Sequence, residues 1–90
     1  MSEPIFTVYT KPNCGFCTRA KAMLTALGLS FKEIHIPEDD QGARAALFER
    51  SGLRTFPQIF FGEQVVGGFS DLSDIEAQHG IKKYFKIGEG

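Results

Sequence analysis

Both cysteines of this 90-residue chain lie in one short segment, Lys11 to Cys17, and only two residues separate them. A β-branched and aromatic run from Ile5 to Thr10 precedes this segment, and a run with helical periodicity from Arg19 to Leu27 follows it. Cys14 therefore stands where a strand passes into a helix. Backbone N–H groups at a helix start are unpaired and favour an anion, so we predict that Cys14 is a low-pKa thiol suited to disulfide exchange.

The spacing of the two cysteines predicts different roles for them. Cys14, nearest the helix start, should attack, and Cys17, one turn further on and more buried, should resolve the mixed disulfide. Lys11 can add positive charge beside Cys14 and lower its pKa further. Two inert thiols are one alternative, and half of a zinc site is another. Structural zinc normally takes four ligands, whereas the chain adds only His35 and His79, far from zinc-finger spacing.

The first half of the chain has the pattern strand, helix, strand. The strand over Ile5 to Thr10 is apolar enough to be covered on both faces, Gly28 is suited to end the helix, and Phe31 to Ile36 form a second strand that Pro37 ends. A helix of this length can serve as a crossover. We therefore expect a right-handed βαβ unit with parallel strands.

The second half is expected to add a helix, a hairpin and another helix. The first helix runs from Gln41 to Arg50, with Gly52 past its end and with Ala43, Ala46 and Leu47 facing inward. Two strands are expected next, Gln58–Phe61 and Gln64–Val66, joined by the turn Gly62-Glu63. They are followed by a helix that is capped by Ser70 or Asp71 and runs to His79, by a docked turn from Ile81 to Phe85, and by a frayed end at residues 88–90.

Together these elements predict one domain over residues 1–90. The fold class is α/β in the order β-α-β-α-β-β-α, with a four-stranded mixed sheet and helices on both faces. With a Cys-x-x-Cys pair at the first strand-to-helix turn, this is the thioredoxin-like arrangement.

Composition narrows the partners and the compartment. The net charge is −1, which gives no electrostatic case for nucleic acid or an anionic membrane, and no apolar run approaches the roughly 20 residues of a membrane span. Met1 to Pro4 have no signal-peptide character, so we expect a cytoplasmic protein. In a reducing compartment a Cys-x-x-Cys pair favours catalysis or metal binding over a structural disulfide.

Three motifs in order make the chain resemble a glutaredoxin over nearly its whole length. They are Tyr9-Thr10-Lys11-Pro12-Asn13-Cys14-Gly15-Phe16-Cys17, Thr55-Phe56-Pro57-Gln58-Ile59-Phe60 and Gly67-Gly68-Phe69-Ser70-Asp71-Leu72. The resemblance implies a glutathione-dependent thiol–disulfide oxidoreductase that reduces glutathione mixed disulfides and protein disulfides. Its implied partners are glutathione, glutathionylated or disulfide-bonded proteins and, through glutathione, glutathione reductase. A monomer is implied.

The resemblance also implies a glutathione groove. Thr55, Phe56 and Pro57 match the family's Thr-Val-Pro, whose proline is cis, and this segment pairs with the tripeptide like an added strand. The segment from Gly68 to Asp71, with Phe69 and Ser70 inside it, holds the γ-glutamyl end, where Asp71 accepts from the ligand's ammonium.

The other end of the tripeptide is expected to meet cations. The resemblance assigns Lys11, and Arg44 by counting along a helix, to the glycine carboxylate. Phe16, beside Cys14, is expected to pack on the bound glutathione or else merely to cover the helix start. Taken alone, Ser70 and Asp71 could be simple helix caps, and Lys11 and Arg44 could be solvated surface residues.

The Cys-Gly-Phe-Cys centre departs from the Cys-Pro-Tyr-Cys of common dithiol glutaredoxins and resembles the Cys-Gly-Phe-Ser of the monothiol branch. In the family, loss of that proline accompanies dimers that bridge a [2Fe–2S] cluster through one cysteine per subunit and two glutathione thiols. Gly15 therefore keeps an alternative open, a cluster-carrying dimer with Cys14 as the metal ligand. The enzyme form needs no metal. A third interpretation is a thioredoxin that uses a flavoprotein as its partner. This sequence lacks the Cys-Gly-Pro-Cys centre and the preceding Trp that are typical of thioredoxins.

Overall fold

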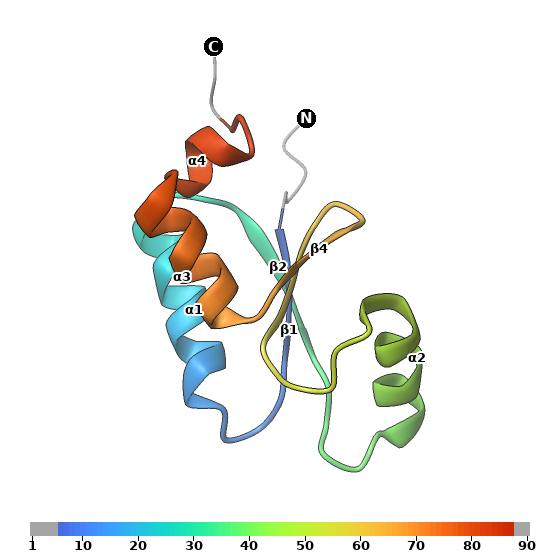
Figure 1. The fold of residues 1–90 in the computed structure, drawn as a ribbon. Coiled ribbons are helices and arrows are strands. Elements are labelled where there is room, and N and C mark those ends of the chain that lie inside the picture. Colours follow the sequence, from blue (N-terminus) through green and yellow to red (C-terminus); the bar gives the residue numbers. More distant parts are fainter. Residues whose placement is uncertain (1–5, 88–90) are drawn as a thin grey trace.

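A computed structural model describes residues 6–87 as four strands and four helices. In chain order they are β1 (Phe6–Thr10), α1 (Gly15–Ala26), β2 (Phe31–His35), α2 (Gln41–Ser51), β3 (Gln58–Phe61), β4 (Gln64–Gly67), α3 (Phe69–Gln78) and α4 (Ile81–Tyr84) (Figure 1). The predicted strand position of Ile5 and the predicted fraying of residues 88–90 lie outside the described residues.

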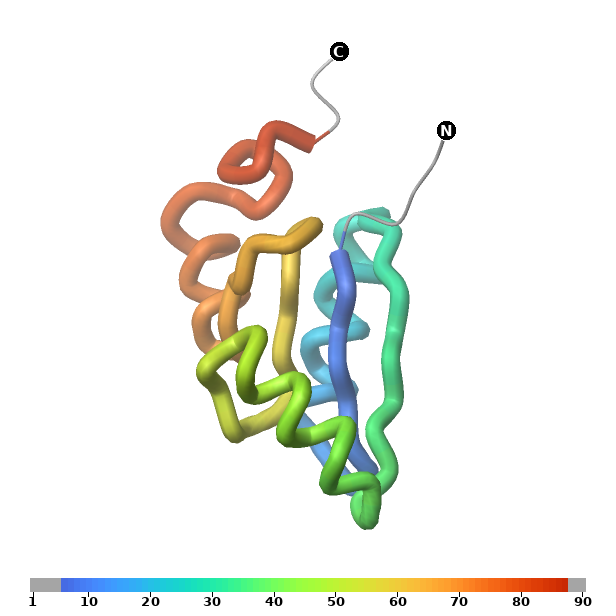
Figure 2. The backbone as a smooth tube through the Cα atoms, turned by 90° about the vertical axis from the view of Figure 1, so that its right-hand side faces the viewer, coloured from blue at the N-terminus to red at the C-terminus, as the bar shows by residue number. Residues whose placement is uncertain are grey.

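The four strands form one mixed sheet in the order β2-β1-β3-β4. β1 and β2 are parallel, as the βαβ pattern predicts, and β3 runs antiparallel to both β1 and β4 (Figure 2). Since β1 lies between two neighbours and is buried along most of its length, the expectation of a strand covered on both faces is confirmed.

Helices cover both faces of the sheet, which confirms the predicted fold class (Figure 1). On one face α1, α3 and α4 bury a core that contains Phe6, Val8 and Ile59. On the other face α2 packs Leu47 against Tyr9 and Phe60. Alternation along β1 therefore sends Val8 to one core and Tyr9 to the other.

Helix α1 begins at Gly15, four residues before the run at Arg19 whose periodicity predicted it. Cys14 is its N-cap in an extended conformation (φ −117°, ψ 102°), and its Sγ accepts a 3.2 Å hydrogen bond from the N–H of Cys17. A sulfur thus takes the capping role that Ser or Asp usually fills, a signal that apolar periodicity does not contain.

Helix α2 shows the predicted boundaries to within one residue. Asp40 accepts a 3.0 Å bond from the N–H of Ala43, and Gly52 ends the helix with φ 75°. The prediction that Ala46 faces inward is wrong, because Ala46 is exposed while Leu47 is buried. A short helix on a sheet buries only a narrow stripe, here along positions 43 and 47.

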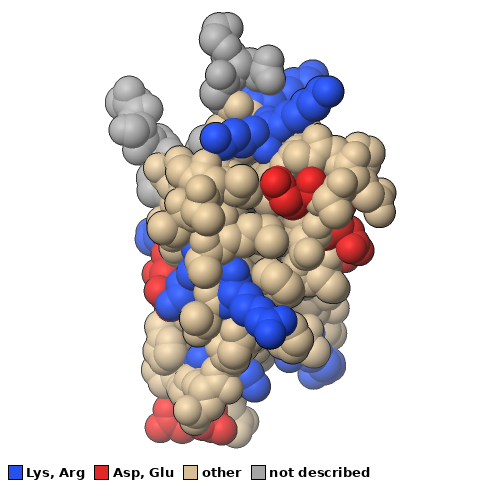
Figure 3. All heavy atoms as spheres, turned by 90° about the vertical axis from the view of Figure 1, so that its left-hand side faces the viewer, with Lys and Arg blue, Asp and Glu red and all other residues tan. Residues whose placement is uncertain are grey.

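The hairpin and the C-terminal helices follow the predicted order. Gly62 makes the β3–β4 turn with φ 61°. The cap of α3 differs from prediction, since the N-cap is Gly68, and Asp71 at the third helical position accepts a 2.9 Å bond from the Gly68 N–H. Lys82 and Lys83 lie in α4, and Figure 3 shows Lys and Arg atoms gathered at that end of the molecule. None of the helices within residues 6–87 is long and apolar enough to cross a bilayer.

Candidate active site

The two cysteines meet at the start of α1. Cys14 and Cys17 are joined as a disulfide with their Cα atoms 5.2 Å apart, so a chemically competent pair is confirmed. Cys17 is 3% exposed and Cys14 is half-buried, which is the predicted asymmetry. On reduction, the N–H of Cys17 that points at the Cys14 sulfur is a donor to its anionic form, and hydrogen bonding to an anion favours it.

A groove of about 250 Å³ lies near this pair, along the loop before β3 and the start of α3. The Phe56–Pro57 peptide bond is cis, as the resemblance implied. The groove is lined by Leu53 and by eight residues that the sequence assigned to glutathione: Phe16, Thr55, Phe56, Pro57, Gly68, Phe69, Ser70 and Asp71. Tertiary structure therefore brings three separate motifs to one surface.

The two walls of the groove approach closely where Gly68 faces Pro57. A Cβ on Gly68 would lie 3.6 Å from the Pro57 carbonyl oxygen. Gly67 has φ 127°, and its missing Cβ leaves room for the carboxyl group of Asp71, whose Cγ would lie only 2.7 Å away. The sequence predicted Gly67 only at the close of the β-hairpin, not as a site residue, and it gave no role to Leu53. A Gly-Gly pair just before a helix is the signal that points to Gly67.

Aromatic side chains form the edge of the groove nearest Cys14. Phe16 is 55% exposed, and its ring stacks on that of Phe69 with centroids 5.8 Å apart. The Arg19 guanidinium also lies over the Phe16 ring, with its Cζ 5.4 Å from the ring centroid. This stack joins the first turn of α1 to the first residue of α3, so this edge of the groove is held between two helices.

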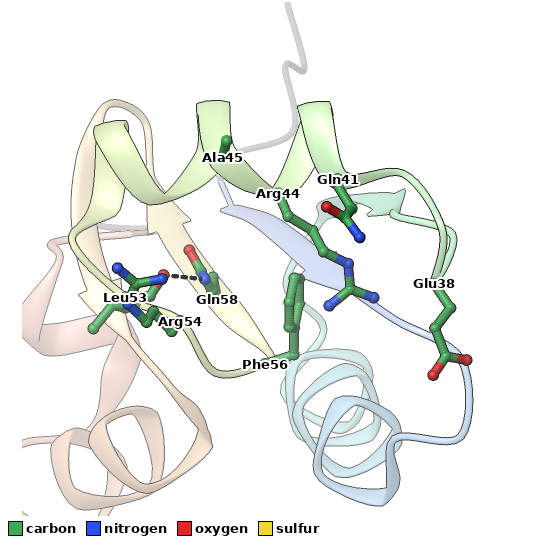
Figure 4. Close-up of a pocket in the computed structure, with 8 residues that line it drawn as sticks. All are labelled: Glu38, Gln41, Arg44, Ala45, Leu53, Arg54, Phe56 and Gln58. Atoms are coloured by element: carbon green, nitrogen blue, oxygen red, sulfur yellow. Dashed lines mark hydrogen bonds between the residues drawn. The ribbon is translucent and has the colours of Figure 1, made fainter.

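Arg44 and Lys11 do not line this groove. Arg44 borders a neighbouring cavity of about 530 Å³, which shares Leu53 and Phe56 with the groove (Figure 4). The Arg44 guanidinium lies 5.3 Å from the centroid of the Phe56 ring, and its Nε is buried with no hydrogen-bond partner among the described residues. Lys11 lines a third cavity, which also contains Cys14.

A Cys-x-x-Cys disulfide at the start of α1, the helix that follows the first strand, together with a nearby cis-proline loop defines a thioredoxin-fold thiol–disulfide oxidoreductase. The glutaredoxin family model matches residues 6–66. Glutaredoxin 3 of Escherichia coli strain K12 is 40% identical over 79 residues, which cover 88% of this chain and 94% of that protein.

Solved structures agree with this relationship. The solution structure of glutaredoxin from Brucella melitensis is 42% identical, with a TM-score of 0.76 and coverage of 92% of this chain and 89% of that one. A buckwheat glutaredoxin in complex with glutathione is 26% identical, with a TM-score of 0.80 and coverage of 93% and 79%. The chain belongs to the glutaredoxin family and is a glutathione-dependent thiol–disulfide oxidoreductase.

Proposed function

We propose that this protein is one glutaredoxin domain over residues 1–90, which reduces glutathione mixed disulfides and protein disulfides with Cys14 as nucleophile and Cys17 as resolving thiol. The observation that carries the proposal is the geometry of the pair. The Cys14 sulfur lies at the end of a helix, accepts an N–H at 3.2 Å and remains partly exposed, while Cys17 is buried behind it. An attacking thiol requires a stabilised thiolate form and a sulfur that solvent and substrate can reach.

The groove supports a site for the tripeptide. The chain at Thr55 and Phe56 lies outside the strands, where its backbone can pair with an extended peptide. Asp71 is exposed at the first turn of α3, so it can accept from the γ-glutamyl ammonium while the adjacent N–H groups receive the α-carboxylate. The buckwheat glutaredoxin, whose structure contains glutathione, supports the same class of ligand.

We assign the glycine carboxylate to Arg44 and Lys11. Phe56 lines both the groove and the cavity with Arg44, so a ligand paired with the backbone of residue 56 would extend toward that guanidinium. At the border of this cavity the Arg44 guanidinium offers a planar fork of N–H donors, which suits a carboxylate. Lys11 would act through charge on the side of Cys14.

The reaction follows from these positions. The Cys14 thiolate attacks the glutathione sulfur of a glutathionylated protein, the bond to the target breaks, and the target leaves as its thiolate. A second glutathione thiolate then attacks the mixed disulfide and leaves with the first as glutathione disulfide, which glutathione reductase recycles. With a protein disulfide as substrate, Cys17 instead attacks the mixed disulfide and closes the Cys14–Cys17 bond. We propose that the protein works as a monomer in the cytoplasm.

The [2Fe–2S] alternative stays a prediction from Gly15. A bridging cluster needs the Cys14 thiolate as a ligand. In this structure the Cys14 sulfur is bonded to Cys17, so this state does not supply that ligand, and no specific observation favours the cluster form.

Turnover of a glutathionylated peptide, coupled to glutathione reductase, tests the proposal. Cys14→Ser should abolish activity, and Cys17→Ser should retain it but lose reduction of protein disulfides that need both thiols. Activity that survives Cys14→Ser would show that the nucleophile is assigned wrongly.

A further inference from the structure

A third cavity, of about 390 Å³, adjoins both cysteines but shares no lining residue with the glutathione groove. Besides the cysteines and their loop, it is lined by a polar set from three elements: Thr10 at the end of β1, Lys21 of α1, and Glu33 and His35 of β2. The proposed reaction gives none of these four residues a role.

The set forms a chain of hydrogen bonds. Thr10 is 2% exposed, and its hydroxyl donates to Glu33 Oε2 at 2.8 Å. The hydroxyl oxygen of Thr10, Oγ1, also lies 3.3 Å from His35 Nδ1. Parallel pairing of Thr10 with His35 in neighbouring strands places the two side chains together.

The hydrogen bonds of Thr10 fix the tautomer of the His35 imidazole. A hydroxyl has one proton, and Thr10 gives it to a carboxylate, which can only accept. The Thr10 oxygen must then accept from His35, so Nδ1 carries the proton. Neutral His35 therefore keeps Nε2 free as a proton acceptor.

Charged side chains surround the hydrogen-bonded set of Thr10, Glu33 and His35. Lys21 Nζ donates to both oxygens of Glu33 at 3.1 Å. The hydrogen bond from Thr10, followed by the contacts with Lys21, holds the pKa of the Glu33 carboxyl below its ordinary value. Glu33 therefore stays anionic at neutral pH, and its charge lines the same cavity as His35 together with those of Lys21 and Lys11.

We propose that His35 accepts the proton of Cys17 through this cavity when Cys17 resolves a mixed disulfide, with Thr10 and Glu33 as positioning residues. The proposal rests on the proposed function, in which Cys17 acts second. In this step the Cys17 sulfur bonds to the Cys14 sulfur, the bond from Cys14 to the sulfur of the substrate protein or of glutathione breaks, and that sulfur leaves with the electron pair as a thiolate. Cys17 is oxidised, the departing sulfur is reduced, and the proton passes to His35.

Burial of the resolving thiol is the reason such an acceptor is needed. A thiol of ordinary pKa, about 8.5, is mostly protonated at neutral pH, and Cys17 is only 3% exposed. Imidazole is the side chain whose charge changes between about pH 5 and 8, which suits a base at neutral pH. Water in the cavity can carry the proton between groups that line the same space.

The test is the rate at which Cys17 releases glutathione from Cys14. Reduced protein is mixed rapidly with excess glutathione disulfide, quenched with acid, and the glutathionylated species is followed by mass spectrometry across about pH 5 to 9. We expect the wild-type rate to rise across the imidazole range. His35→Asn should lose this rise and react at least about tenfold more slowly near pH 7.

His79→Asn is the matched control, because His79 contacts Tyr84 at the far end of the chain and should leave the rate and its pH profile unchanged. Thr10→Val keeps the imidazole but removes the hydroxyl, so it should slow release to an intermediate extent. Equal rates and pH profiles for wild type, His35→Asn and Thr10→Val would overturn the inference. Turnover of Cys17→Ser separates the two proposals: if it is absent, the proposed function fails, whereas normal turnover with unaltered His35→Asn kinetics removes only the proton acceptor.

Discussion

The carboxyl group of Asp71 fills the space that a side chain on Gly67 would need. A Cβ at position 67 would lie 2.7 Å from Asp71 Cγ, closer than real Cβ contacts come. The position of Asp71 at the polar end of the groove therefore depends on the missing side chain of Gly67, the β4 residue with φ 127°.

Gly67→Ala should weaken glutathione binding and destabilise the fold. Displacement of Asp71 should raise KM for a glutathionylated peptide severalfold, and the unfavourable φ should cost about 1–3 kcal/mol of unfolding free energy. Steady-state kinetics and urea unfolding measure the two effects. Gly62→Ala is the matched control, since Gly62 has φ 61° but open space around it, and it should lose stability with KM unchanged.

Asp71→Asn should separate ligand binding from helix capping. The amide oxygen can still accept from the Gly68 N–H, so stability should change by less than about 0.5 kcal/mol. The lost charge should raise KM for the glutathionylated peptide about tenfold, because hydrogen bonds to charged groups contribute about 1.5–3 kcal/mol. Asp74→Asn, also exposed on α3, should leave KM unaltered. Equal KM values for both variants would leave Asp71 as a cap alone.

Arg44→Gln should raise KM for glutathione by removing the proposed carboxylate partner, and the effect should shrink at high salt. Arg44→Lys should restore only part of it, because an ammonium lacks the planar fork that stacks on Phe56. Arg54→Gln changes a second arginine of the same cavity, one stacked on Phe48, and serves as the comparison. A larger effect of Arg54→Gln would move the carboxylate site to that residue.

Gly15→Pro should fold normally and be stabilised by about 0.4–1 kcal/mol through a less flexible unfolded chain. Position 15 is the first helical residue, where proline is tolerated, and an added Cβ would meet no atom within 4 Å. Cys14 already has the extended conformation that precedes proline. Thermal unfolding provides the measurement, and a lowered melting temperature would contradict it.

Glu33→Gln should destabilise the protein at neutral pH but not in acid. The folded-state pKa of Glu33 is lowered from 4.5, so the ionised carboxyl stabilises the fold above that value, and this contribution is lost as pH falls through the folded-state pKa. Because the side chains of Glu33 and Lys21 are 35% and 33% exposed, the effect should be at most about 1 kcal/mol. Urea unfolding at pH 7 and at about pH 3 compares the variants, and a difference that persists in acid would point to another cause.

Some parts of this site could be predicted because their signals are local. The Cys14–Cys17 spacing, the glycines that follow α1, α2 and α3, and the order of elements are all set by neighbours in the chain. The cap at Gly68 was missed because Asp71 reaches back from within the helix, and the inward face of α2 was misjudged at Ala46 because the sheet offers it only a narrow contact. The separation of Arg44 from the groove depends on where α2 packs, which its own sequence does not specify.

The amino-acid sequence by itself determined the order of strands and helices, the position of Cys14 at a helix start, and the family to which three motifs belong. Only the tertiary structure decided that the Asp71 carboxyl occupies the space beside Gly67 where a side chain would lie. It also decided that His35 lines the same cavity as Cys17, which lies 18 positions earlier in the chain. The physical reason is range. Periodicity and capping act within a few residues, whereas the register of β1 against β2 and the docking of α1 bring together side chains that carry no mutual signal along the chain.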